Sequence, residues 1–380
     1  MIIGFDASRA FTRNRTGTEN YSYQILLNLS KIDHTNNYHV YLRPPIDLDK
    51  IKSSYPWPGN FKFLILNFKF LWTQMGLAKQ TFTDPLDVLF IPAHTLPLIR
   101  KPGLKTVVTV HDLGAEYLPQ THQLKQKLYL KFMTHWQLKS ATHLIAVSKA
   151  TKSDLVKKTG LPSERVSVVY EGYNKKLFKP LSYDQVVDVL NQFDLVPQNY
   201  FLFVGTIQPR KNLARLISAY AKSLAGGGKR GKMTKLVLAG SKGWLSDEIY
   251  ALPKKLGIED QVCFLGYVPD EKLPALYSGA RALFYPSLFE GFGLPILEAM
   301  ATGCPVLTSQ ATSCSEAAGK AAILVNPYSE REISRGINLL LDDEKLKKEL
   351  INKGFKQCQK FSWEKAARET LSILKVTQVT

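Results

Sequence analysis

Residues 200–224, YFLFVGTIQPRKNLARLISAYAKSL, place an apolar run of strand length directly before a helical pattern. The first five residues are all apolar, as in a strand that is buried on both faces, and Gly205 ends the run. After the basic turn, apolar residues recur at the spacing of a helix that covers a sheet. The stretch therefore predicts a strand, a turn and a crossover helix, which is the repeating unit of a parallel sheet.

The same alternation extends in both directions along the chain. Seven further runs rich in Val, Ile, Leu and Phe have strand length and stop at Gly, Ser, Asp or Pro. They are residues 105–112, 142–148, 165–172, 235–240, 261–266, 280–287 and 304–309. Amphipathic stretches such as DEKLPALYSGA separate them, and the apolar start MIIGF predicts a first strand rather than a signal peptide.

Length and strand spacing predict two domains. A chain of 380 residues suits two cores of ordinary size, and no strong strand occurs in residues 174–199. We therefore predict an α/β protein with two Rossmann-like parallel-sheet lobes. The predicted lobes are residues 1–180 and 181–360, with a C-terminal helix near 361–380 that packs back on the first lobe.

Charge narrows the class of partner. The formal net charge is +18, and residues 1–180 hold 25 Lys and Arg against 12 Asp and Glu. Such an excess attracts phosphates, anionic lipid or nucleic acid. The basic residues are scattered and accompany no nucleic-acid motif, so nucleic acid is the least favoured of the three. The four cysteines lack CxxC spacing, which favours free thiols in a reducing compartment, so we expect a cytoplasmic protein.

One segment of the first lobe raises the question of a membrane. FKFLILNFKFLW, residues 61–72, interleaves aromatic residues with lysines but is too short and too charged to span a bilayer. In one interpretation the segment is a strand followed by a helix, and its aromatic residues belong to the core. In the other, its aromatic and basic residues, together with the positive charge of the first lobe, contact an anionic membrane surface from one side. The sequence leaves both interpretations open.

Ligands of open parallel sheets bind at the carboxyl ends of the strands, so the residues that follow each predicted strand are the site candidates. These residues are His111, Asp112, Lys149, Gly205, Gly266 and Tyr267. Neither GxGxxG nor GxxxxGK[ST] is present, so the usual phosphate loops are missing. Arg210 and Lys211 follow a strand and precede a helix, which suits a diphosphate, although a solvated basic turn would read the same way.

The stretch FEGFGLPILEAMATGCPV, residues 289–306, places two glutamates eight positions apart around a glycine turn. Gly291 and Gly293 permit a sharp turn, and the following residues predict a helix with Glu298 in its first turn. Two carboxylates there could accept hydrogen bonds from paired hydroxyls of ribose or a hexose. A purely structural role, with Glu298 complementing the helix dipole and Glu290 capping the turn, is the alternative.

Taken together, the motifs resemble retaining glycosyltransferase family 4. The resemblance rests on FEGFGLPILEAMATGCPV, GTIQPRKN, FLGYVPDEKLPALYSGARALFYPS, AVSKATKSDL and SEAAGKAAILVNP, and it extends from the first strand to FSWEKAARETL. RTGTENYSYQIL resembles the glycine loop of the family, with Thr18 where a second glycine is often found. VHDLG resembles the segment that carries its active-site histidine. The resemblance implies the GT-B fold, two lobes facing a central cleft.

The resemblance also implies roles for individual residues. Arg210 and Lys211 would bind the donor diphosphate and act in catalysis with His111, which would contact the sugar near its anomeric carbon. Glu290, the fourth residue with an implied catalytic role, would hold the transferred hexose, and Glu298 would bind the ribose. The other implied substrate contacts are Gly17, Thr18, Asp112, Gly205, Gly266, Tyr267, Phe292, Gly293 and Leu294.

The activity that this implies is transfer of a hexose, with retention, from a nucleoside-diphosphate sugar to an acceptor hydroxyl in glycan, polysaccharide or glycolipid biosynthesis. We expect mannose from GDP-mannose first and a UDP-hexose second, with a glycan or lipid-linked acceptor, no cofactor and no metal. Asp47 and Asp49 form a DxD-like pair but lie in a loop-like part of the first lobe. A non-catalytic sugar-nucleotide-binding protein is the alternative from another functional class.

Overall fold

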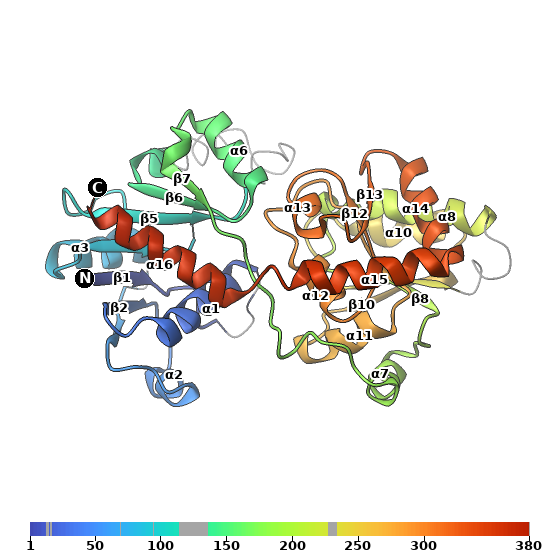
Figure 1. The fold of residues 1–380 in the computed structure, drawn as a ribbon, viewed down its shortest axis with the longest axis horizontal. Coiled ribbons are helices and arrows are strands. Elements are labelled where there is room, and N and C mark those ends of the chain that lie inside the picture. Colours follow the sequence, from blue (N-terminus) through green and yellow to red (C-terminus); the bar gives the residue numbers. More distant parts are fainter. Residues whose placement is uncertain are drawn as a thin grey trace. The chain divides into compact units, whose positions relative to one another are not determined.

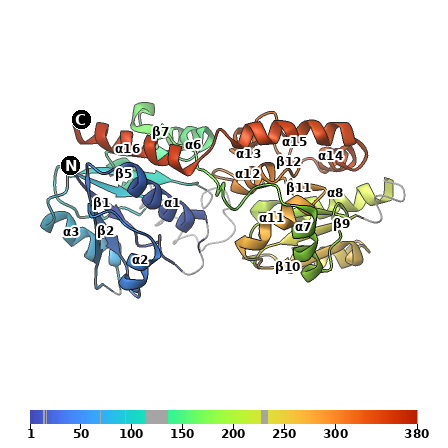
Figure 2. The ribbon, with the colours of Figure 1, turned by 60° about the horizontal axis from the view of Figure 1, so that its bottom comes forward.

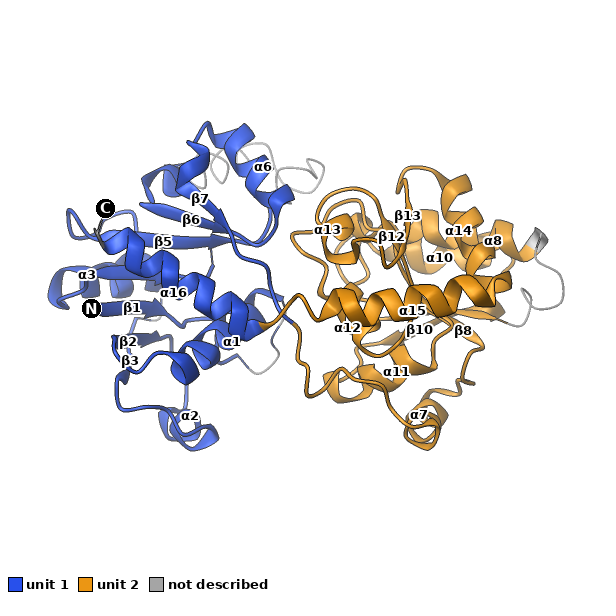
Figure 3. Cartoon of the chain, viewed as in Figure 1, with its two compact units in different colours: residues 1–172, 363–380 blue, residues 173–362 orange. Residues whose placement is uncertain are grey.

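The computed structural model describes residues 1–379 except 13, 14, 16, 69, 94, 114–135 and 227–233. The chain forms two compact units, shown in Figure 3. Unit 1 comprises residues 1–172 and 363–380, and unit 2 comprises residues 173–362. Unit 2 is thus one continuous segment of chain, whereas unit 1 is assembled from two.

Unit 1 is built around a seven-stranded parallel sheet with the strand order β3-β2-β1-β4-β5-β6-β7. The strands are β1 (Ile2–Asp6), β2 (Asn37–Leu42), β3 (Phe61–Ile65), β4 (Val88–Ile91), β5 (Lys105–Val110), β6 (His143–Ala146) and β7 (Val166–Val168). Its helices are α1 (Gly17–Ile32), α2 (Leu48–Ser54), the π-helix η1 (Trp72–Leu77), α3 (Ala78–Thr83), α6 (Lys149–Thr159) and α16 (Trp363–Val379).

Unit 2 repeats this plan with six parallel strands in the order β10-β9-β8-β11-β12-β13. The strands are β8 (Tyr200–Val204), β9 (Lys235–Ala239), β10 (Val262–Gly266), β11 (Ala282–Tyr285), β12 (Val306–Ser309) and β13 (Ile323–Val325). The helices are α7 (Tyr183–Leu190), α8 (Leu213–Gly226), α10 (Asp247–Lys255), α11 (Leu273–Gly279), α12 (Leu294–Ala301), α13 (Cys314–Ala318), α14 (Glu330–Asp342) and α15 (Glu344–Cys358).

Helices lie on both faces of each sheet (Figures 1 and 2), so the central strands are buried on both sides. Every residue of β4, β8 and β11 is buried, and their side chains are almost all Val, Leu, Ile, Phe and Tyr. Burial of about 1.5–3 kcal/mol per large apolar side chain is the main stabilising contribution of such a core. Strands that are buried on both faces consist of continuous apolar residues, which explains why such runs in the sequence predicted these strands.

The C-terminal helix α16 belongs to unit 1. It packs against α1, β4 and β5, beside α1 in Figure 1. Its first residue, Trp363, is buried and makes an edge contact with the ring of Tyr21 on α1, with the ring centroids 5.9 Å apart. The unit 1 boundary at Gly172 lies eight residues before the end of the expected first lobe, residues 1–180.

The segment 61–72 is divided between core and surface. Phe61 and Trp72 are buried, and Phe68 packs against the core cluster of unit 1. Phe70 is exposed, and Lys69 lies outside the described residues. No helix in the described part of the chain is long and apolar enough to cross a membrane.

Candidate functional site

The strand order of unit 2 reverses between β8 and β11, and the loops that follow these two strands diverge there. The turn after β8 carries Arg210 and Lys211 in a short 3-10 helix, η5 (Pro209–Lys211). The segment after β11 carries Glu290. A backbone hydrogen bond of 2.9 Å from the Leu288 amide to the Arg210 carbonyl joins the two segments. The fold therefore brings together residues that are 80 positions apart.

Arg210, Lys211, Tyr285 and Glu290 form one hydrogen-bonded group, which we call the charge cluster. The Arg210 guanidinium donates to Glu290 Oε2 at 2.8 Å and also to the carbonyl of Phe289 at 3.1 Å. The Lys211 ammonium donates to Glu290 Oε1 at 2.6 Å and to the Tyr285 hydroxyl at 2.6 Å. Both carboxylate oxygens of Glu290 are thus occupied by cations.

Burial decides how strongly these charges interact. Lys211 and Glu290 are each only 6% exposed. Burial alone would raise the pKa of Glu290, but the charges of Lys211 and Arg210 outweigh this effect and lower the pKa to about 2. Glu290 is therefore ionised at neutral pH, whereas burial lowers the pKa of Lys211 against the raising effect of Glu290.

Glu298 has a different environment from Glu290. It accepts a hydrogen bond of 2.9 Å from the neutral hydroxyl of Tyr277 on α11. Burial raises the pKa of Glu298 to about 7, against the smaller lowering effect of Tyr277. The two glutamates of the glycine turn therefore differ in charge state, and Glu298 titrates near neutral pH.

The helix that carries Glu298 begins differently from the prediction. Helix α12 begins at Leu294, so Pro295 lies in its first turn as expected, but Glu298 is the fifth residue and lies beyond the first turn. The prediction that Glu298 lies in the first turn was therefore wrong, and the alternative in which it complements the helix dipole loses its basis. Gly293 precedes the helix with φ of 101°, a left-handed conformation that favours glycine.

Other contacts fix the glycine turn in place. The Ser313 hydroxyl donates to the Glu290 carbonyl at 2.8 Å. Phe292 is buried with its ring edge against Phe361, at 5.5 Å between centroids. The backbone of 290–294 is therefore held from both sides, with Phe292, Gly293 and Leu294 on one short segment beside the charge cluster.

Glycines allow three strand ends of unit 2 to approach closely. The Gly240 amide donates to the Gly266 carbonyl at 2.7 Å. A Cβ atom on Gly240 would lie 2.0 Å from the Gly205 carbonyl oxygen, so only glycine fits there. Gly205 and Gly266 thus lie at strand ends on either side of β9, both close to Gly240, and Tyr267 follows Gly266 and is 63% exposed.

In unit 1, His111 directly follows β5 and is held at both ring nitrogens. Nδ1 lies 3.2 Å from Glu171 Oε1, and Nε2 lies 2.8 Å from the carbonyl oxygen of Pro92. A backbone carbonyl oxygen can only accept a hydrogen bond, so Nε2 carries a proton in this geometry, and Nδ1 faces the carboxyl group of Glu171. Burial lowers the pKa of His111, but the hydrogen bond and charge of Glu171 reverse this effect and raise it.

The ring of His111 is also packed on one face. The edge contact with Tyr21 places the ring centroids 4.6 Å apart, and Tyr21 in turn contacts Trp363 of α16. In this arrangement Nε2 of His111 is a hydrogen-bond donor to the Pro92 carbonyl.

The remaining candidates of unit 1 lie at element ends. Gly17 and Thr18 begin α1, and a Cβ atom on Gly17 would meet nothing within 4 Å, so packing inside unit 1 does not require a glycine there. Asp112 follows His111 in the chain. Lys149 begins α6, immediately after Ser148, whose side chain accepts a hydrogen bond from the Thr151 amide.

Sequence reasoning missed three residues that the structure places at these sites. Glu171 is the seventh residue of the predicted run 165–172 and lies three residues after β7 ends, and its position after a strand was a usable signal. Tyr285 and Tyr277 lie within a strand and a helix, where an apolar environment was the simplest interpretation. Their hydroxyl partners lie far away in sequence, so the local pattern held no sign of them.

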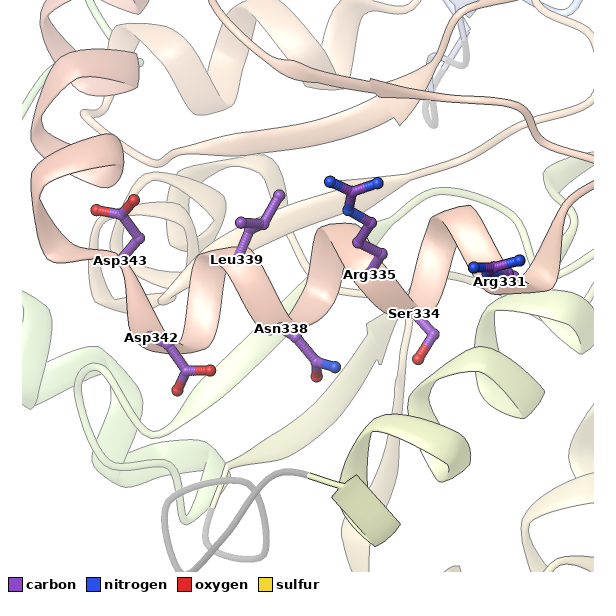
Figure 4. Close-up of a pocket in the computed structure, with 7 residues that line it drawn as sticks. All are labelled: Arg331, Ser334, Arg335, Asn338, Leu339, Asp342 and Asp343. Atoms are coloured by element: carbon purple, nitrogen blue, oxygen red, sulfur yellow. The ribbon is translucent and has the colours of Figure 1, made fainter.

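Two shallow hollows lie elsewhere on the described surface. One of about 460 Å³ runs along α14 and is shown in Figure 4. It is lined by Arg331, Ser334, Arg335, Asn338, Leu339, Asp342 and Asp343. The other, of about 410 Å³, lies on α6 and includes Lys149. Neither contains a residue of the charge cluster.

Among the described residues, no group of three or more His, Cys, Asp or Glu side chains could hold a metal ion. In the DxD-like pair, Asp47 has a structural role, because its side chain accepts a hydrogen bond of 3.0 Å from the Lys50 amide and caps α2. The four cysteines are unpaired.

Family comparison accounts for both units. The sequence model described as Glycosyltransferase Family 4 matches residues 15–177, and the model described as Glycosyl transferases group 1 matches residues 187–357. An O-antigen chain mannosyltransferase B of Escherichia coli is 34% identical over 272 residues, which cover 72% of this chain and 70% of that protein. The chain belongs to the group 1 and family 4 glycosyltransferases. The resemblance inferred from the motifs is confirmed.

Other glycosyltransferases extend the comparison. The O-antigen chain mannosyltransferase RfbU of Salmonella typhimurium is 31% identical over 241 residues, which cover 63% of this chain and 60% of that protein. Among solved structures, Anabaena HepE in complex with UDP and glucose superposes with a TM-score of 0.74 at 18% identity, covering 99% of this chain and 100% of that chain. This glycosyltransferase therefore has the predicted GT-B fold.

Proposed function

We propose that this glycosyltransferase transfers mannose from GDP-mannose to an acceptor hydroxyl, with retention of anomeric configuration. The charge cluster is the observation that carries the proposal. A departing nucleoside diphosphate develops negative charge, and two fixed cations at a strand-end crevice are suited to stabilise it. Arg210 would bind the phosphates through its planar fork and Lys211 as a point charge.

The neighbouring residues suit the other parts of a donor. Glu298 would accept hydrogen bonds from the ribose hydroxyls, and Glu290 with the turn Phe292–Leu294 would hold the hexose. Gly205 and Gly266 leave room at the strand ends, and the exposed ring of Tyr267 could stack on the base. From unit 1, Gly17, Thr18 and Asp112 would contact the donor, and His111 would contact the sugar near its anomeric carbon.

The cluster also suggests how donor binding changes the site. Before the donor arrives, Glu290 neutralises one of the two cations. The incoming diphosphate supplies competing negative charge, so Arg210 and Lys211 would turn to the phosphates and free the carboxylate of Glu290 for sugar hydroxyls. The cations would then do the electrostatic work for which other phosphate sites use a metal, so no metal would be required.

The choice of mannose is supported by the names of the two relatives, both O-antigen chain mannosyltransferases. A UDP-hexose is the second candidate, because the structural neighbour HepE was solved with UDP and glucose. The acceptor would be a growing glycan, free or lipid-linked, met at the cytoplasmic membrane face. The basic first lobe supports that location.

A donor panel tests the proposal. Hydrolysis of GDP-mannose, UDP-glucose, UDP-galactose and UDP-N-acetylglucosamine would be compared for the wild type and Arg210→Ala. Lys222→Ala is the matched control, because Lys222 is an exposed cation paired with Glu330. We expect GDP-mannose to be hydrolysed fastest, Arg210→Ala to lose this activity and the control to keep it.

The same panel can refute the proposal. Equal hydrolysis by the wild type and Arg210→Ala would show that Arg210 of the charge cluster takes no part in the reaction. Faster hydrolysis of a UDP-hexose than of GDP-mannose would show that the donor is a UDP-hexose. Proton NMR of the transfer product would give the anomeric configuration, and inversion would contradict retention.

A further inference from the structure

One part of the unit 1 surface is apolar and basic at the same time. Phe70 is 83% exposed, Leu71 66%, Met75 52% and Ile99 73%. We call these four residues the apolar ridge. Scattered single apolar residues are common on protein surfaces, but clustered ones of this size indicate a binding surface.

Hydrogen bonds hold the two segments of the ridge side by side. The Gln74 side chain of η1 donates to the Leu96 carbonyl at 3.2 Å and accepts from the Leu98 amide at 2.8 Å. Gln74 therefore fixes the segment that carries Ile99 against the helix that carries Met75. The ridge is a built surface and not a chance meeting of two loose loops.

The backbone before η1 is shaped to turn apolar side chains outward. Leu71 has φ of 47°, a left-handed conformation that is unfavourable for leucine. Directly after it, Trp72 is buried and anchors η1 in the core of unit 1. η1 is a π-helix, a rare form found most often at functional sites. The inward Trp72 and the outward Phe70 and Leu71 are thus fixed by one strained turn.

The chain around the ridge is mainly basic. Residues 50–111 contain only two acidic residues, Asp84 and Asp87, against eight Lys and Arg residues. These are Lys50, Lys52, Lys62, Lys69, Lys79, Arg100, Lys101 and Lys105. Lys101 is exposed, and its amide donates to Thr81 Oγ1 on α3 at 3.0 Å, which brings it near Lys79 on the same helix.

We propose that the apolar ridge inserts into the headgroup region of a bilayer rich in anionic lipid, with the exposed side chains of Lys79 and Lys101 bound to the headgroups. Apolar side chains inside a basic surface are the pattern of proteins that lie on such membranes. A second copy of the chain is a poorer occupant, because a symmetric contact would bring two basic surfaces together. The proposal rests on the proposed function in that it supplies a membrane site for the lipid-linked acceptor.

Vesicle co-sedimentation tests the surface. The full chain would be mixed with vesicles of phosphatidylcholine alone or with about 30% phosphatidylglycerol, an anionic lipid. We expect binding to the anionic vesicles at about 50 mM salt and much less at about 500 mM, where charges are screened within a few Å. The variant Phe70→Ser/Leu71→Asn/Ile99→Ser should bind at least tenfold more weakly. Asn suits position 71 because it tolerates the left-handed conformation.

Matched variants separate the ridge from general surface effects. Tyr183→Ser/Val196→Ser removes two equally exposed apolar side chains from unit 2 and should bind as the wild type does. Lys79→Gln/Lys101→Gln should lose binding to anionic vesicles at low salt. The melting temperature of each variant, measured without lipid, should equal that of the wild type.

Three results would overturn the proposal. They are no binding of the wild type to anionic vesicles at low salt, undiminished binding of the ridge variant, and loss of a dimer instead of vesicle binding in that variant. Donor hydrolysis measured without vesicles keeps the two hypotheses apart. If the protein binds vesicles but hydrolyses no sugar nucleotide, the membrane role of the ridge stands and the proposed function is refuted. If it hydrolyses a sugar nucleotide but does not bind vesicles, only the membrane role of the ridge is refuted.

Discussion

Glu290→Gln should destabilise the fold markedly, whereas Glu298→Gln should not. Glu290 is buried between two cations that lower its pKa from 4.5 to about 2. At 1.36 kcal/mol for each tenfold change in the proton equilibrium, the cations favour the ionised carboxylate by about 3 kcal/mol. Glutamine keeps the shape but loses the charge, so Arg210 and Lys211 would be left facing a neutral amide.

The loss should appear in thermal unfolding at pH 7. For a domain of this size, about 3 kcal/mol corresponds to a fall of about 6–12 °C in melting temperature. Because the folded pKa is depressed, this stabilisation is present above the unfolded pKa and disappears as pH falls through the folded value. The difference between wild type and variant should therefore narrow between pH 4.5 and about 2.

Glu298→Gln is the matched control in the adjoining helix α12. Its pKa is raised to about 7, so the folded state already favours the neutral form, which glutamine imitates. We expect its melting temperature at pH 7 to equal or exceed that of the wild type. Equal destabilisation by the two substitutions, or a Glu290→Gln effect that does not change down to pH 2, would refute this account of the cluster.

Three further predictions concern ligand binding and titration. Arg210→Ala should weaken binding of the nucleoside diphosphate at least tenfold by calorimetry, because a forked cation is lost; an unchanged affinity would contradict the diphosphate assignment. Nucleoside diphosphate binding should weaken as pH falls through about 7, where Glu298 takes up its proton, and Tyr277→Phe should move this transition to higher pH; a flat pH profile would argue against contact between Glu298 and ribose. Glu171→Gln should lower the pKa of His111 in an NMR titration, and the stability advantage of the wild type over this variant should be complete below pH 6.5 and lost as pH rises through the folded pKa; an unshifted His111 would show that Glu171 does not control it.

The sequence predicted those strands whose burial produces a continuous apolar run. All eight such runs contain a strand, and the first strand was also expected. The strands that the sequence analysis did not predict are β2, β4 and β13. β2 includes asparagine and histidine, and β4 and β13 have only four and three residues. Runs this short or this mixed cannot be distinguished from loops without their neighbours.

The site residues divide along a similar line. Arg210, Lys211 and Glu290 could be predicted from the sequence because each follows a strand, and topology alone places strand ends together. The hydrogen bonds among these side chains could not be predicted, since they depend on side-chain packing between residues 80 positions apart in sequence. The opposite pKa shifts of Glu290 and Glu298 also depend on tertiary partners. An error of one residue in the expected start of α12 was enough to misplace Glu298.

The segment 61–72 shows the same limit within a single stretch. Its aromatic residues looked alike in sequence, yet Trp72 is a core residue and Phe70 lies in solvent. The left-handed turn at Leu71 separates them, and no local pattern marks a leucine for that conformation. Neither of the two sequence interpretations was complete, because the segment contributes both to the core and to the surface.

The return of α16 to unit 1 affects how the chain matures during synthesis. Unit 2 is encoded by uninterrupted sequence, so all its residues leave the ribosome while unit 1 still lacks its last helix. Until residues 363–379 emerge, the faces of α1 and β5 that α16 covers stay open to water. Unit 2 can therefore fold first, and chaperones have a defined apolar target in the unfinished N-terminal segment.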